Sequence, residues 1–150
     1  MKKLLYFLLI GAFTTAFGQQ NSKNPMVLTN GIVASSGFIK TIEKEQNVKS
    51  VNVYKSKDNL PENLKSYADF AQNGLINIEL KENYYDKIKL ASLNGSYDLP
   101  AENPIYFDGF VLNDPKMVIL GNVLEQIDLK KINGKDVLVI SSTPKENSVK

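Results

Sequence analysis

Few residues of this chain could do nucleophilic chemistry. Ser142 and Lys145 have the Ser-x-x-Lys spacing, in which a lysine can activate a serine nucleophile. That chemistry places the serine at the start of a helix, with the lysine one turn later. Here Pro144 and a polar tail follow the serine, so we interpret the motif as part of the surface.

Carboxylates offer a second possible chemistry. Asp98, Glu102, Asp108 and Asp114 lie close together in the sequence, and two of them could form the carboxylate pair of a glycoside hydrolase. Acidic residues in turns are more often solvated or bonded to nearby backbone N–H groups, and we favour that interpretation. The same segment lacks the alternating oxygen ligands of a calcium loop.

Two aromatic pairs, Tyr84–Tyr85 and Tyr106–Phe107, could stack on a sugar or a peptide. Aromatic pairs beside strands pack more often in the core or at a sheet edge. We therefore expect them to stabilise the fold rather than to bind a ligand.

The residue types that the chain lacks exclude several functions. It has no histidine and no cysteine, so a serine–histidine–aspartate triad, a thiolate nucleophile and the usual zinc sites cannot be built. It has no arginine, and its charges balance once the first residues are removed, which argues against nucleic-acid binding. We therefore predict a protein that is not an enzyme and has no catalytic residue, cofactor or metal site.

The N-terminus has the layout of a secretory signal peptide. Lys2 and Lys3 precede an apolar stretch, residues 4–13, and small residues before Gln19 suit cleavage after residue 18. The alternative is an uncleaved anchor, but residues 4–17 are shorter than the ~20 residues that a spanning helix needs. We predict export across the inner membrane, no membrane span after cleavage, and 16 lysines against 16 acidic residues in the mature chain.

The sequence carries one pattern twice, which indicates a duplicated supersecondary unit. We predict a first repeat in residues 19–82, a connecting helix and second repeat in residues 83–143, and a polar tail in residues 144–150. Each copy has an apolar run that ends in a turn pair, then an alternating segment, then a second apolar run. These are Asn30-Gly31, 48–55 and 75–80 in the first copy, and Asp108-Gly109, 124–131 and 137–140 in the second.

Local patterns predict the elements of the first copy. Asn30-Gly31 suits a tight turn between strands 26–28 and 32–33, because both residues tolerate positive φ. Ser36 is expected to cap a short helix that runs out near Asn47. In the next strand, Val51 and Val53 alternate with polar residues, which predicts that the valines face the core.

Residues 56–74 are the main difference between the copies. They predict a helix capped by Asn59, with Leu64, Tyr67, Ala68 and Ala71 on one face. Asn73-Gly74 would end this helix, with Gly74 in a left-handed conformation.

The corresponding connection in the second copy is shorter. Asn133-Gly134 predicts a two-residue hairpin there. Between the copies, residues 87–93 predict a helix with Ile88 and Ala91–Ser92 facing inward. The expected fold is α+β: a small mixed β-sheet with short covering helices and two repeats.

At the family level, the first copy resembles the plug domain of TonB-dependent outer-membrane receptors, particularly the SusC-like branch. The turn Asn30-Gly31, the run Val48-x-Ser50-Val51-x-Val53-x-Lys55 and the segment Asn73-Gly74-Leu75-Ile76-x-Ile78 stand where the family has its motifs. The resemblance covers residues 25 to about 81, with a weaker echo in residues 103–141. Ala68 departs from the pattern, because the family has glycine there.

The resemblance implies a stand-alone plug-like module in the periplasm at the outer membrane. Such a module would plug, gate or dock on a β-barrel, a transporter or translocon, formed by another chain. The residues expected at structural or contact positions are those of the repeated motifs: Asn30, Gly31, Val51, Val53, Asn73, Gly74, Asp108 and Gly109. The alternative is a soluble periplasmic or secreted binding protein that reuses a plug-like fold for another ligand.

Overall fold

The computed structural model describes residues 24–142, apart from the side chain of Val123. The predicted signal peptide and the polar tail lie outside these residues, as does Lys145 of the Ser-x-x-Lys motif.

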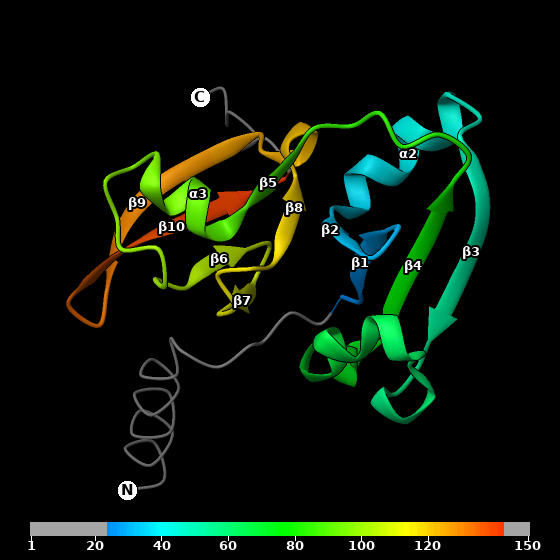
Figure 1. Cartoon of the computed structure of the whole chain (residues 1–150), viewed down its shortest axis with the longest axis horizontal. Coiled ribbons are helices and arrows are strands. Elements are labelled where there is room, and N and C mark those ends of the chain that lie inside the picture. Colours follow the sequence, from blue (N-terminus) through cyan, green and yellow to red (C-terminus); the bar gives the residue numbers. More distant parts are fainter. Residues whose placement is uncertain (1–23, 143–150) are drawn as a thin grey trace, which may run out of the picture.

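The described chain forms two β-sheets with short helices, as the sequence predicts for an α+β fold (Figure 1). The first sheet has six strands in the order β3-β4-β1-β2-β8-β5, and the second has four in the order β7-β6-β10-β9. The strands are β1 (Met26–Thr29), β2 (Ile32–Ala34), β3 (Val48–Tyr54), β4 (Leu75–Leu80), β5 (Lys87–Lys89), β6 (Ile105–Phe107), β7 (Phe110–Leu112), β8 (Val118–Leu120), β9 (Gln126–Ile132) and β10 (Lys135–Ser141). The helices are α2 (Ser36–Lys44) and α3 (Leu90–Gly95), with 3-10 helices η1 (Lys57–Asn59), η2 (Glu62–Asn73) and η3 (Gly121–Val123).

Helix α2 begins one residue earlier than the sequence suggested. Its cap is Ser35 rather than Ser36: the Phe38 N–H donates to the Ser35 hydroxyl at 3.1 Å. Phe38 and Ile42 are buried, as expected from their spacing on one helix face. The helix ends at Lys44 and the chain reverses at Gln46, where φ is 55°.

The connection between β3 and β4 is helical, but of the 3-10 type, and Asn59 lies inside η1 instead of capping a longer helix. The buried side chains of η2 explain the difference. Leu64, Tyr67 and Phe70 recur every third residue, which matches the three residues per turn of a 3-10 helix. An α-helical spacing predicts that Ala68 is on the buried face. In the structure Phe70 is buried there instead, beside Ala71.

Gly74 follows η2 with φ 88° and ψ 158°. The positive φ was expected, but the residue is extended rather than left-handed helical. This conformation lets the Gly74 carbonyl accept from the Met26 N–H at 3.2 Å, so the end of η2 leads directly into the β1–β4 ladder.

The predicted helix over residues 87–93 is wrong in its first half. Residues Lys87–Lys89 form strand β5, and α3 begins only at Leu90. The apolar residues of this segment face the core from two kinds of element: Ile88 is half-buried on the strand, and Leu90 and Leu93 are buried on the helix.

The two copies have the same strand order and strand senses. In the first, β4 pairs antiparallel with β3 and parallel with β1, which pairs antiparallel with β2. In the second, β10 pairs in the same way with β9 and β6, and β6 with β7. The register also corresponds: Thr29 lies opposite Ile78, and Phe107 lies opposite Ile140. A common origin by duplication stays a prediction.

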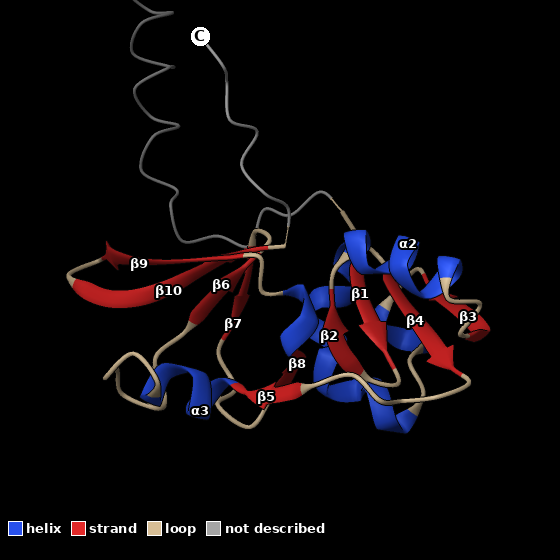
Figure 2. Ribbon diagram, turned by 90° about the horizontal axis from the view of Figure 1, so that it is seen from above, coloured by secondary structure: helices blue, strands red, loops and turns tan. Residues whose placement is uncertain are grey.

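One hydrophobic core joins the copies. Strands β8 and β5, from the second half of the chain, extend the first sheet beyond β2 (Figure 2). Phe70 of the first copy meets Phe110 of the second edge-on, with ring centroids 6.0 Å apart. The two sheets therefore belong to one packed unit.

Replacing Gly74 with alanine is expected to destabilise the protein by about 1–3 kcal/mol, because this region of φ and ψ is nearly restricted to glycine. An added Cβ would meet only ordinary contacts, the nearest at 3.6 Å, so the cost comes from the backbone. Gly95→Ala is the matched control, since its Cβ would meet nothing within 4 Å. Urea unfolding measures both variants, and equal midpoints would contradict the assignment.

Candidate functional site

The turn at Asn30-Gly31 closes the first hairpin and binds the neighbouring parallel strand. Asn30 and Gly31 have φ of 47° and 75°. The Asn30 N–H donates to the Ile78 carbonyl at 2.9 Å, and the Asn30 side-chain oxygen accepts from the Leu80 N–H at 3.0 Å. Asn30 therefore clasps the end of β4 with both its backbone and its side chain.

Asp108-Gly109 makes the same clasp in the second copy. Asp108 has φ 47°, its N–H donates to the Ile140 carbonyl at 3.0 Å, and its carboxylate accepts from the Ser142 N–H at 2.8 Å. The Ser142 hydroxyl donates to the other carboxylate oxygen. We call Asn30 and Asp108 the Asx clasps. Asp108 and Ser142 use their polar atoms to hold the second turn in place, so the pair has a structural role rather than a catalytic one.

Tyr67 extends the first clasp into η2. Its hydroxyl donates to the Gly31 carbonyl at 2.8 Å, and the Gly31 N–H donates to the Asn77 side chain at 3.0 Å. Burial of the Tyr67 phenol, with a contribution from the charge of Asp114, raises its pKa to about 12. The hydroxyl thus stays protonated and keeps donating.

The prediction that the valines of strand β3 face the core is wrong. Val51 and Val53 are 55% and 60% exposed, instead of facing the core. The alternation is real, but the half-buried positions are the polar ones between the valines. A bulge at Lys49, between the pairs Val48–Leu80 and Ser50–Glu79, brings Val48 and Val51 to the same face.

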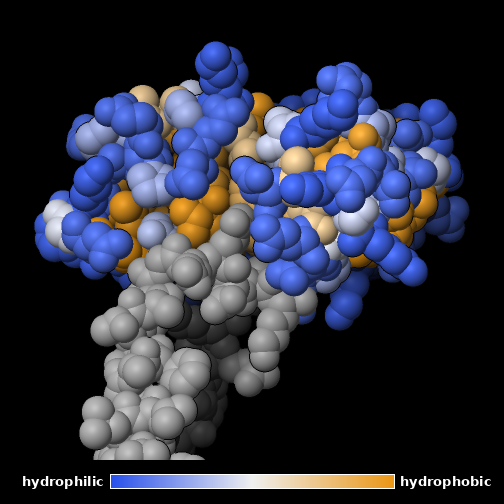
Figure 3. Space-filling model, turned by 90° about the horizontal axis from the view of Figure 1, so that it is seen from below, coloured by the Kyte–Doolittle hydropathy of each residue, from blue (hydrophilic) through white to orange (hydrophobic). Residues whose placement is uncertain are grey.

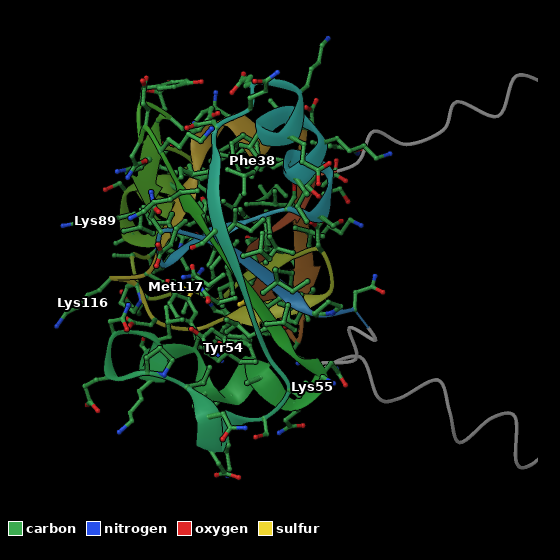
Figure 4. All side chains as sticks on the ribbon, turned by 90° about the vertical axis from the view of Figure 1, so that its right-hand side faces the viewer. Phe38, Tyr54, Lys55, Lys89, Lys116 and Met117 are labelled. Carbon is green, nitrogen blue, oxygen red and sulfur yellow. The ribbon has the colours of Figure 1, made fainter. Side chains whose placement is uncertain are left out.

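β3 is also an edge strand. In the part of the chain that the structure describes, no strand pairs with its outer side, and Figure 4 shows its ribbon running across the front of the molecule with Tyr54 and Lys55 at its end. The edges at β5 and β7 are only three residues long, whereas β3 and β9 have seven each. Short edges resist pairing with other chains and long ones invite it.

A groove runs between α2 and β3. It holds about 340 Å³, its floor is Ile78, and Ile39 and Val51 line its two sides. Glu43, Gln46 and Lys81 form its polar rim. Helix α2 thus covers the centre of the sheet and leaves β3 uncovered, and apolar surface is visible at the end of the molecule where β3 lies (Figure 3).

The second copy offers a matching edge of different character. β9 places Leu129 opposite Leu138, just as β3 places Val53 opposite Ile76, and Leu129 is 56% exposed. However, Lys131 on this strand pairs with Asp136 at 3.0 Å. The β9 edge therefore has a single exposed apolar side chain among charges of both signs.

Tyr84 and Tyr85 form a latch with Glu45. Both phenol hydroxyls donate to the Glu45 carboxylate, that of Tyr84 at 2.8 Å, and Tyr85 packs edge-on against Phe38 with centroids 4.8 Å apart. These hydrogen bonds, from Tyr85 first and Tyr84 second, lower the pKa of Glu45 below its ordinary value of 4.5. The hydrogen bond with the Tyr85 hydroxyl at 3.3 Å, and after it the bond with Glu45, raise the pKa of the Tyr84 phenol. The latch holds the loop after β4 on the end of α2.

A larger cleft lies between the two copies. It holds about 610 Å³. Its apolar lining includes Val27, Val33 and Ile76 from the first copy and Phe107 and Phe110 from the second, and Ser35 and Ser36 are among its polar residues. The second clasp, with Asp108 and Ser142, forms part of its wall.

The remaining acidic candidates do not converge on a site. Asp114 accepts from the Lys116 N–H at 2.9 Å within its own turn, and Glu102 is exposed in a loop. Within residues 24–142, no group of three acidic side chains could hold a metal ion. Tyr106 and Phe107 lie in β6. Phe107 is buried in the core as expected, whereas Tyr106 is half-buried on the other face of the strand.

No family model, curated protein or solved structure matches the chain. None of the helices among the described residues is long and apolar enough to cross a membrane.

Asn30→Ala should destabilise the fold by about 1–2 kcal/mol, because it leaves the Leu80 N–H without its acceptor and forces alanine to a positive φ. Asn30→Asp is the matched control, since Asp108 makes the same clasp with a carboxylate. Chemical unfolding of the two variants measures the difference. If alanine and aspartate behave alike, the side-chain acceptor is not what stabilises the turn.

The latch makes the stability of the protein depend on pH. Because the pKa of Glu45 is lower in the folded state, its contribution is present above pH 4.5 and is lost as pH falls through the folded pKa. The gap in unfolding free energy between wild type and Glu45→Gln should therefore narrow as pH decreases below 4.5. Thermal unfolding from pH 7 to pH 3 tests this, with Glu102→Gln as an exposed control that should show no such trend. A gap independent of pH would contradict it.

Proposed function

We propose that this chain is a non-enzymatic interaction module that docks on another protein through the free edge of β3. The observation that carries the proposal is the combination of an unpaired seven-residue edge with two valines that are more than half exposed. An unpaired edge offers a row of backbone donors and acceptors, and exposed apolar side chains beside it add contact area. Together they allow an extended segment of a partner to add as a further strand.

Composition and site geometry favour binding over catalysis. The chain has no histidine, cysteine or arginine, and Asp108 and Ser142, the most suggestive polar pair, hold the second hairpin in place. A backbone edge needs none of the missing residue types. The proposed activity therefore uses what the sequence has, namely β-branched side chains and main-chain groups.

The nature of the partner rests on the sequence resemblance. A plug-like module secreted to the periplasm would meet an outer-membrane β-barrel formed by another chain, and would plug it, gate it or dock at its periplasmic mouth. In this proposal the first copy makes the contact, because it carries both the plug-like motifs and the exposed edge.

A charge placed on the edge tests the proposal. Val53→Lys should reduce co-purification with the barrel from outer-membrane extract at least about tenfold, because lysine at a central contact removes apolar burial. The side chain is 60% exposed, so stability should change by less than about 0.5 kcal/mol.

Leu129→Lys is the matched control, since it makes the same change at the corresponding position of the other edge. The proposal predicts that this variant co-purifies like the wild type. Equal retention of both variants would mean that β3 is not the contact. Failure of the wild type to co-purify with any membrane protein would remove the barrel as partner.

The cleft between the copies supports a second candidate function, a soluble periplasmic binding protein for another ligand. Its volume of about 610 Å³ and its mixed walls suit a small molecule with both apolar and polar groups. In that case a bulky substitution at an exposed position of the cleft wall, such as Ser36→Trp, would abolish ligand binding, while Val53→Lys would leave it unchanged.

A further inference from the structure

The charges that β3 itself and the residues directly after it carry are all of one sign. From Val48 to Lys57 the charged residues are Lys49, Lys55 and Lys57, and the first acid along the chain is Asp58. Lys49 has Glu79 of the neighbouring strand at 3.8 Å, with both side chains largely exposed. Lys55 follows the strand, is exposed, and has no such acidic neighbour within the described chain.

This arrangement disfavours pairing between two copies of the protein. A symmetric antiparallel pairing of two β3 edges, centred on Asn52, would bring Val51 of one copy opposite Val53 of the other. The same register brings Lys49, in the bulge, near Lys55 of the other copy at both ends. Like charges directly opposite each other destabilise a strand pair, and lysines on edges prevent unwanted pairing in many sheets.

We propose that the β3 edge selects an extended segment of a partner protein in which two alternate apolar side chains are flanked by carboxylates. The apolar pair would cover Val51 and Val53, and the carboxylates would lie near Lys55 at one end and near the bulged Lys49 at the other. The lysines thus have two roles, since they attract the acidic partner and exclude a second copy. This inference rests on the proposed function and specifies the chemistry of its partner.

The groove beside β3 strengthens the selection. A partner side chain next to Val51 would enter the space between α2 and β3, onto Ile39 and the buried Ile78. This space is apolar at its floor, so it favours an aliphatic residue at that position of the partner. The β9 edge has no comparable pattern, because Asp128, Lys130 and Lys131 surround Leu129 with both signs of charge.

A pair of synthetic peptides tests the selection directly. The first has the sequence Glu-Thr-Val-Thr-Val-Thr-Glu, with blocked ends, and the second has lysine in place of both glutamates. Added to the ¹⁵N-labelled protein, the acidic peptide should shift the amide resonances of β3 and leave those of β9 unchanged. It should bind at least about fivefold more tightly than the lysine peptide, which is the effect expected of two exposed ion pairs.

A second test asks whether the lysines prevent two copies of the protein from pairing through β3. Lys55→Glu makes the edge self-complementary, because the introduced carboxylate of each copy would lie near Lys49 of the other. The wild type should sediment as a monomer and the variant as a dimer at the same concentration. Adding Val53→Lys to Lys55→Glu should restore the monomer, and Lys131→Glu on the other edge is the control that should stay monomeric.

Several results would overturn the inference. A dimeric wild type would show that the lysines do not exclude a second copy. Equal binding of the two peptides, or no shift of β3 amides with either, would show that the edge does not select carboxylates. A monomeric Lys55→Glu variant would contradict the proposed register. Co-purification sensitive to Val53→Lys, together with failure of the acidic peptide, would retain the proposed docking function and reject only the chemistry assigned to its partner.

Discussion

The fold depends on one local constraint, the clasp that an Asn or Asp makes from inside a tight turn. The turn residue takes a positive φ, which few residue types tolerate, and its side-chain oxygen reaches the backbone N–H two residues beyond the last paired residue of the parallel strand. A hairpin alone does not fix the register of a parallel neighbour. The Asx clasp does, because a one-residue slip would leave both the side chain and that N–H without partners.

The clasp also determines which strands become edges. It ties β4 to β1 and β10 to β6, so β4 and β10 are internal strands, and their antiparallel neighbours β3 and β9 occupy one edge of each sheet. The connection from β3 to β4, and the equivalent connection from β9 to β10, can then differ in length without disturbing this register. It contains two 3-10 helices in the first copy and the two-residue turn Asn133-Gly134 in the second.

The sequence predicted those parts of the fold that local chemistry determines. Asn30-Gly31, Asp108-Gly109 and Asn133-Gly134 are turns with positive φ because their residue types allow little else there. The facing of Val51 and Val53 could not be predicted, because alternation identifies two faces of a strand and not which face a helix covers. A groove separates helix α2 from β3, and the bulge at Lys49 depends on the pairing with β4. Whether residues 62–73 form an α-helix or a 3-10 helix likewise depends on a tertiary contact, the packing of Phe70 against Phe110.

The exposure of Val51 and Val53 makes β3 informative about function. Valine at more than half exposure on a long edge is a liability in a protein that works alone, since such edges template association. Two features of this chain limit that liability: lysines at both ends of the strand, and the absence of any acid on it that a second copy could pair with. The β9 edge, at the corresponding place on the same scaffold, instead carries one exposed leucine and an internal ion pair. Two copies with one architecture therefore differ where a partner would add, and the difference lies in side chains that the fold itself does not need.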